Sequence, residues 1–262
     1  MESTEGMTWM SNLSSLNQGL EREFESTLTE EIIPGILHNF ANPLNGIMGR
    51  SKLLQRKLEI SKEGDSVPDF NDMYNKVIRD VDLISRDTDR LSVLLQNVAE
   101  KLNVVNNKLC VHGINLSEIL AIEMSFFDFH LDFKHNVKKT LDLSPDIPEV
   151  NGVPADFSLS LWALIRCAML RMKNCDLREL VVATENLGDC VLIKIANTGT
   201  YISQDEWVNI VGFLENKNPN ISESELDSML LSSILLLTKY HAQFQLDNVN
   251  GMSCLKIRIP VK

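Results

Sequence analysis

Apolar residues recur at steps of three and four between about residues 20 and 58, which places them on one face of a long helix. Charged residues such as Glu30, Glu31 and Arg50 occupy the opposite face. Pro34 and Pro43 interrupt the pattern, and because an interior proline costs a helix ~3 kcal/mol, a kink is expected near Pro43. The stripe consists of Ile33, Ile36, Leu37, Phe40, Leu44, Ile47, Met48, Leu54 and Leu58.

A second helical stripe follows a turn at residues 61–68 and predicts a partner helix of roughly the same length. A hairpin this long cannot hide its apolar face alone, so we expect two chains to pair their hairpins as a four-helix bundle in a homodimer. The alternative is a bundle within one chain that uses the C-terminal part. The second stripe contains Phe70, Met73, Tyr74, Val77, Val81, Ile84, Leu91, Leu94, Leu95, Val98, Leu102 and Val105.

The pattern changes after residue 107 and predicts a mixed sheet with helices on one face. The chain as a whole is therefore expected to be α+β, with a polar lead at 1–19, a helical hairpin at 20–107 and a second domain at 108–262. A short strand enters a helix at 114–120, with Ser117 near its cap. The expected strands lie near 139–143, 180–184, 190–196, 244–246 and 253–260, and the expected helices at 156–172 and 227–241.

Composition excludes several classes of protein. The chain has 262 residues and 44% hydrophobic residues, which is incompatible with disorder as the main state. A net charge of −11 argues against binding nucleic acid through a general basic surface. The five cysteines are odd in number and form no CxxC pair, so we expect reduced thiols and no metal site. No secretory signal and no bilayer-spanning apolar run are visible, so a cytoplasmic protein without membrane contact is expected.

The segment from His38 to Leu44 reads His-Asn-Phe-Ala-Asn-Pro-Leu. With His38, Asn42, Pro43 and Leu44 in these places, it resembles the H-box of two-component sensor histidine kinases. The resemblance implies that His38 is a phosphoacceptor on the first helix of a dimeric hairpin, and that the partner is the receiver domain of a response regulator. The residue type suits this role, since neutral imidazole is a nucleophile near neutral pH.

One position departs from the H-box pattern. Asn39 stands where the family usually has Asp or Glu, the carboxylate that orients the imidazole and takes its proton during autophosphorylation. Asparagine can form hydrogen bonds but is not a base. Asn39 therefore argues against efficient autokinase chemistry.

The second domain is similar in element order to the ATP-binding domain of the same family, but its nucleotide motifs are degenerate. Ala163 and Cys167 replace the two asparagines of the magnesium-binding helix, and a thiol is a poor ligand for Mg²⁺. Asn197 replaces the aspartate that reads adenine. Gly199 remains, but Tyr201 replaces the second glycine of that motif.

The last nucleotide motif, a glycine-rich stretch, corresponds to residues 224–233, which contain no glycine. We therefore expect no cofactor and a protein similar to dimeric histidine phosphotransferases, passing a phosphoryl group between His38 and receiver aspartates. One alternative is an ATP- and Mg²⁺-dependent sensor kinase with diverged motifs. Another is a response-regulator phosphatase in which Asn42 orients the attacking water. A third is a non-catalytic module that binds a regulator or a kinase.

Overall fold

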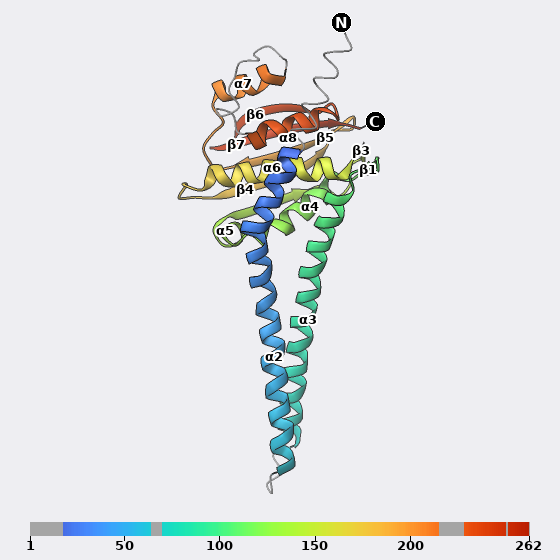
Figure 1. Cartoon of the computed structure of the whole chain (residues 1–262), viewed down its shortest axis with the longest axis vertical. Coiled ribbons are helices and arrows are strands. Elements are labelled where there is room, and N and C mark those ends of the chain that lie inside the picture. The colour runs from blue at the N-terminus through green and yellow to red at the C-terminus, as the bar shows by residue number, and fades with distance from the viewer. Residues whose placement is uncertain (1–17, 64–69, 215–227, 250, 262) are drawn as a thin grey trace.

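The computed structural model describes residues 18–63, 70–214, 228–249 and 251–261 (Figure 1). Residues 18–27 are helical and continue through a π-helical stretch, η1 (Leu28–Ile32), into α2 (Ile33–Glu63). Helix α3 (Phe70–Asn106) packs along α2, and the pair projects as a long hairpin from the rest of the molecule. Both predicted long helices are confirmed.

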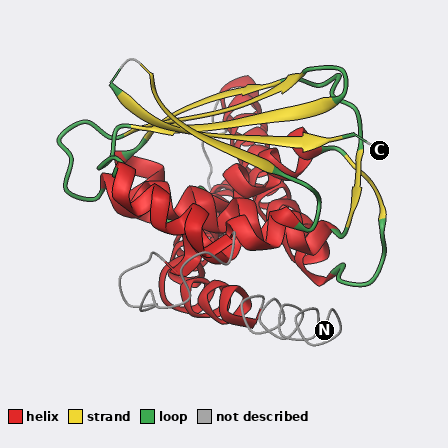
Figure 2. Ribbon diagram, turned by 90° about the horizontal axis from the view of Figure 1, so that it is seen from above, coloured by secondary structure: helices red, strands yellow, loops and turns green. Residues whose placement is uncertain are grey.

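The second part of the chain is built on a five-stranded mixed sheet in the order β2-β4-β5-β7-β6. Strands β2 and β4 are parallel, and the other neighbours are antiparallel. Helices α4, α6 and α8 lie on one face of this sheet (Figure 2). The strands are β2 (Lys138–Leu143), β4 (Glu179–Asn186), β5 (Cys190–Asn197), β6 (Gln243–Val249) and β7 (Met252–Pro260), and the helices are α4 (Leu116–Phe127), α6 (Pro154–Met172) and α8 (Ser228–Thr238). The predicted α+β class, with a helical hairpin ahead of an α/β sandwich, is confirmed.

Several details differ from the sequence prediction. Asn115, not Ser117, caps α4, because its Oδ1 accepts hydrogen bonds from the backbone N–H groups of Ser117 and Glu118. Helix α8 ends at Thr238, and the turn after it places His241 in the left-handed region with φ 56°. The short strand expected to enter the helix at 114–120 is β1 (His112–Ile114), which ends at Ile114. The pattern missed three other elements, which are β3 (Val150–Gly152), α5 (Leu131–Asn136) and α7 (Gln204–Leu214).

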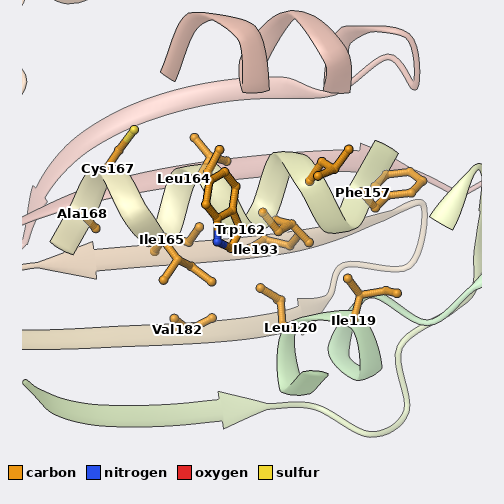
Figure 3. Packing of buried hydrophobic residues seen from close by; sticks show 14 of the residues in the cluster. Ile119, Leu120, Phe157, Trp162, Leu164, Ile165, Cys167, Ala168, Val182 and Ile193 are labelled. Carbon is orange, nitrogen blue, oxygen red and sulfur yellow. The ribbon is translucent and has the colours of Figure 1, made fainter. Parts of the chain in front are cut away.

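Helix α6 lies at the centre of the hydrophobic core, and most of its side chains are buried. Figure 3 shows Ile165 on the side of the helix that faces Val182 and Ile193 of the sheet, whereas Cys167 lies on the opposite side. A helix that is apolar all round must be covered on more than one side. Here the sheet, α4 and α8 provide that cover.

The N-terminal end of the first helix belongs to the same core. Leu20, Phe24 and Ile32 are buried, and the Phe24 ring meets the Trp162 ring of α6 edge to face with centroids 5.2 Å apart. A Cβ atom on Gly35 would lie 1.6 Å from the Phe129 carbonyl oxygen, so only glycine allows this approach. The base of the hairpin is therefore packed firmly against the sheet domain.

Further from the sheet, the hairpin leaves an apolar stripe open to solvent. Leu44 and Val81, two of the predicted bundle-core residues, are exposed in the single chain, while Phe40 and Leu91 are half-buried. Within the described residues, the sheet domain does not extend along this part of the hairpin, so the alternative of a bundle within one chain is not formed there (Figure 1). No helix in the described part of the chain is both long and apolar enough to cross a membrane.

Candidate functional site

His38 lies on α2 and its side chain is exposed. Within the described residues its imidazole takes part in no hydrogen bond or ion pair, so both ring nitrogens are open to an incoming group. Asn42 is exposed one turn further along the helix, and residues four apart share a face. The imidazole of His38 and the amide of Asn42 therefore form one accessible polar surface.

Asn39 has a different environment from the one that its place in the motif implies. It is only 4% exposed, and its Oδ1 accepts a hydrogen bond of 2.8 Å from Lys134 Nζ on α5. Its Nδ2 also donates to the Asp128 carbonyl oxygen, at 3.5 Å. Successive helix residues point about 100° apart, so the Asn39 amide is turned towards the sheet domain and away from the His38 ring.

Two of the degenerate nucleotide motifs come together beside α6, whereas residues 224–227 of the third lie outside the described residues. Ala163 and Cys167 are buried, and the hollow lined by Cys167 and Asn197 has a volume of only about 30 Å³. Small-molecule sites measure roughly 300–1,000 Å³. The hollow formed by the described residues is therefore far too small for a nucleotide. Its other lining residues are Leu164, Ala168, Arg171, Ile195, Ile202, Leu230, Leu246, Ser253 and Leu255.

The polar groups of this region are paired with each other. Asn197 Oδ1 accepts a 2.9 Å hydrogen bond from the backbone N–H of Gly199. A Cβ atom on Gly199 would lie 2.7 Å from the backbone of Arg171, so this glycine permits a close approach within the protein. The Tyr201 hydroxyl donates to the Gly251 carbonyl oxygen at 2.5 Å. These residues hold the loop after β5 in place.

A fully buried polar cluster joins the hairpin to the sheet domain. Lys101 Nζ of α3 contacts both Glu123 carboxylate oxygens of α4, at 2.7 and 2.6 Å, and Ser158 Oγ of α6, at 2.8 Å. Burial lowers the pKa of the Lys101 ammonium and raises the pKa of the Glu123 carboxyl, while the ion pair opposes both effects. Lys101 could have been noticed in the sequence, because this charged residue occupies a position on the apolar stripe between Val98 and Val105.

A second ionic cluster ties η1 to the sheet domain. Arg166 of α6 donates to both Glu31 carboxylate oxygens, at 2.7 and 2.9 Å, and this hydrogen bonding lowers the pKa of Glu31 to about 2. His130 Nδ1 accepts from the backbone N–H of Phe133 and so caps α5. That leaves His130 Nε2 as the protonated nitrogen, and it donates to Glu31 at 2.8 Å. Helix α5 is thus attached to the first helix at two points, Glu31 and Asn39.

The contacts that join α5 to the first helix were not predicted from the sequence. Lys134 lies 95 positions after Asn39, and no local pattern links the two. Among the described residues, no group of three or more His, Cys, Asp or Glu side chains is arranged to hold a metal ion.

No model of a known protein family matches the sequence, and no curated protein matches it. Solved structures do resemble the fold. The histidine kinase AdeS of Acinetobacter baumannii is 18% identical, covers 83% of this chain and 98% of its own, and has a TM-score of 0.44.

Two further structures illustrate the range of the likeness. The catalytic domain of the histidine kinase ThkA is 13% identical, covers 58% of this chain and 96% of its own, and has a TM-score of 0.47. A bacterial phosphotransferase is 12% identical, covers 86% of this chain and 93% of its own, and has a TM-score of 0.39. At such low identity the likeness concerns the fold alone, and the chemistry of the site depends on the residues of this chain.

Proposed function

We propose that this protein is a histidine phosphotransferase of two-component signalling. His38 takes a phosphoryl group from the aspartyl phosphate of one receiver domain and passes it to the aspartate of another. A lone pair on an imidazole nitrogen forms the N–P bond, while the P–O bond breaks and the aspartate carboxylate leaves with its electron pair. The ring loses its N–H proton to solvent. The observation that carries the proposal is an open imidazole within an H-box on a rigid helix.

The proposal includes loss of ATP binding by the domain at 108–262. The hollow of about 30 Å³ at Cys167 and the internal hydrogen bonds of Asn197 and Tyr201 support it. Phosphoryl transfer between a histidine and a receiver needs no nucleotide, so this domain can serve as a scaffold. We expect no Mg-ATP binding in titration calorimetry at millimolar nucleotide, and saturable micromolar binding would favour the sensor kinase alternative.

The proposal also includes a homodimer formed through the hairpin. Leu44, Leu53, Leu58, Ile78 and Val81 are exposed in the single chain although they lie on amphipathic helices. Burial of these apolar side chains against the hairpin of a second copy removes them from water and so stabilises the pair. A four-helix bundle would cover the stripe and leave His38 at its surface.

The function is tested by incubating the protein with phosphorylated candidate receivers and detecting acid-labile phosphate on it. His38→Ala is expected to abolish phosphate uptake with little change in stability, because the side chain is exposed. His135→Ala is the matched control, since His135 is also exposed but lies on α5. Uptake by His38→Ala would refute the phosphotransfer proposal, and absence of uptake by the wild-type protein would leave a regulator-binding role.

A second candidate function is dephosphorylation of a receiver, and the exposure of Asn42 on the face of His38 favours it. An amide there can orient a water molecule for in-line attack on an aspartyl phosphate. Asn42→Ala is expected to slow the loss of phosphate from a bound receiver while sparing transfer to His38.

A further inference from the structure

The hydrogen bond between Asn39 and Lys134 places a cation beside the H-box. Asn39 directly follows His38 on α2, and Lys134 Nζ lies 2.8 Å from the Asn39 amide oxygen. Lys134 is half-buried, so its side chain is only partly covered where α5 meets α2. Its flexible four-carbon stem allows the ammonium to move several ångströms without any change in the backbone.

Lys134 differs from the other cations around α5 in the charge of its partner. Lys138, Lys139 and Arg178 each pair with a carboxylate, whereas among the described residues the only hydrogen-bond partner of the Lys134 ammonium is the neutral amide of Asn39. The three carboxylates are those of Glu179, Asp128 and Asp132. Among the described residues, Lys134 therefore forms no ion pair, although the chain has a net charge of −11.

The position of Lys134 relative to His38 is fixed by the contacts between α2 and the sheet domain. His130 joins the beginning of α5 to Glu31, and Glu31 also binds Arg166 of α6. Gly35, between Glu31 and His38, touches the Phe129 carbonyl oxygen just before α5. A sheet domain held in this way keeps one ammonium group next to the turn of α2 that carries His38.

We propose that Lys134 binds the phosphoryl group at His38 and that Asn39 holds the Lys134 ammonium ready for it. This inference rests on the proposed phosphotransfer function. In phosphoryl transfer, negative charge is spread over the three equatorial oxygens, and a prepositioned cation stabilises it. When the group arrives, the Lys134 ammonium leaves the Asn39 amide and contacts a phosphoryl oxygen. Asn39 is then a positioning residue.

The proposal gives a physical reason for an amide at position 39. A carboxylate there would pair with Lys134 and neutralise it, whereas an amide holds the lysine by a weaker bond and leaves its charge in place. Asn39→Asp, which restores the acidic residue usual in the H-box, should therefore slow transfer in this protein.

The first test measures the rate of phosphoryl transfer from a phosphorylated receiver to His38 over a range of receiver concentrations. Lys134→Gln and Asn39→Asp are expected to lower the maximal rate about tenfold, because one charged stabiliser of the transferring group is lost or neutralised. Lys134→Arg should restore most of the rate. Lys76→Gln is the matched control, since it removes one exposed lysine charge at the far end of α3.

The second test requires no receiver. Phosphoramidate can transfer its phosphoryl group to the His38 imidazole with release of ammonia, and phosphorus NMR then follows the ionisation of that group. Lys134→Gln should raise the pKa of the phosphoryl group on His38, because a nearby cation favours the dianion. Circular dichroism and light scattering confirm that each variant remains folded and assembled as the wild-type protein is.

The outcomes separate the two proposals. If the wild-type protein transfers phosphate and Lys134→Gln matches it in both rate and phosphoryl pKa, the role of Lys134 is refuted and the function stands. If no receiver phosphorylates the wild-type protein, the function fails, and the NMR titration still decides whether Lys134 acts on a phosphoryl group at His38. A faster Asn39→Asp variant would refute the positioning role of Asn39.

Discussion

The buried Lys101 cluster makes a sharp prediction about stability. Lys101→Met keeps most of the apolar stem but removes the ammonium, which contacts both Glu123 oxygens and lies 4.9 and 5.8 Å from the centroids of the Phe24 and Phe126 rings. All three polar side chains of the cluster are fully buried. Removing one partner of a buried ion pair leaves an uncompensated charge and costs about 3–5 kcal/mol. We expect a loss in this range from urea unfolding followed by circular dichroism at one fixed protein concentration.

The pH dependence of the stability of Lys101→Met shows whether the unpaired Glu123 carboxylate causes the loss. Without Lys101, only burial and the Ser158 hydroxyl act on Glu123, so its folded-state pKa rises further. A carboxyl with a raised folded pKa favours folding when it is protonated. The penalty of Lys101→Met is therefore small below the ordinary pKa of glutamate, about 4.3, and grows as pH rises through the folded value.

A combined variant supplies the control. Replacing the whole cluster by Lys101→Met, Glu123→Leu and Ser158→Ala removes the polar groups together, so stability should return to within about 1 kcal/mol of the wild-type protein. The reasoning is refuted if Lys101→Met alone costs less than about 1 kcal/mol, or if the triple variant is as unstable as the single one.

Three further predictions concern the packing of the hairpin. Gly35→Ala should destabilise the protein by more than about 2 kcal/mol in the same urea assay, because the new methyl group would overlap the Phe129 carbonyl. Leu44→Asp should lower the apparent mass in light scattering by weakening the proposed dimer, and an unchanged mass would contradict the proposed interface. Because the pKa of Glu31 is lowered to about 2, its contribution to stability is present above about pH 4.3 and is lost as pH falls through about 2. Glu31→Gln should flatten this part of the acid unfolding curve, and the effect should shrink in high salt since the side chain is partly exposed.

Helices and strands in which apolar residues recur at a regular spacing could be predicted from the sequence. A motif whose residues are close together in the chain could be predicted as well. The helices at 33–63 and 70–106 follow from their stripes, and β5 and β7 follow from segments rich in apolar and β-branched residues. His38 was a candidate because its defining neighbours Asn42 and Pro43 lie within two turns of it. Short elements such as α5 escaped, since six residues are too few to show a period.

The surroundings of the site could not be predicted, because they depend on tertiary contacts. Asn39 was interpreted as a weakened catalytic residue, yet its side chain is buried against α5. The partner lysine comes from a segment 95 positions away that carries no motif. Lys101 and Glu123 could have been suspected, since each interrupts an apolar helical face, but only the fold reveals that they meet.

The π-helical stretch at Leu28–Ile32 determines how the side chains after it are rotated about the helix axis relative to the side chains before it. Leu20 and Phe24 before it and Asn39 beyond it are buried against the sheet domain, whereas His38, Leu44 and Met48 are exposed. A π-bulge is equivalent to one residue inserted into an α-helix, and one residue turns everything downstream by about 100°. A single deletion there would keep every side chain of the H-box and the geometry of its helix, yet aim His38 and the apolar stripe in new directions.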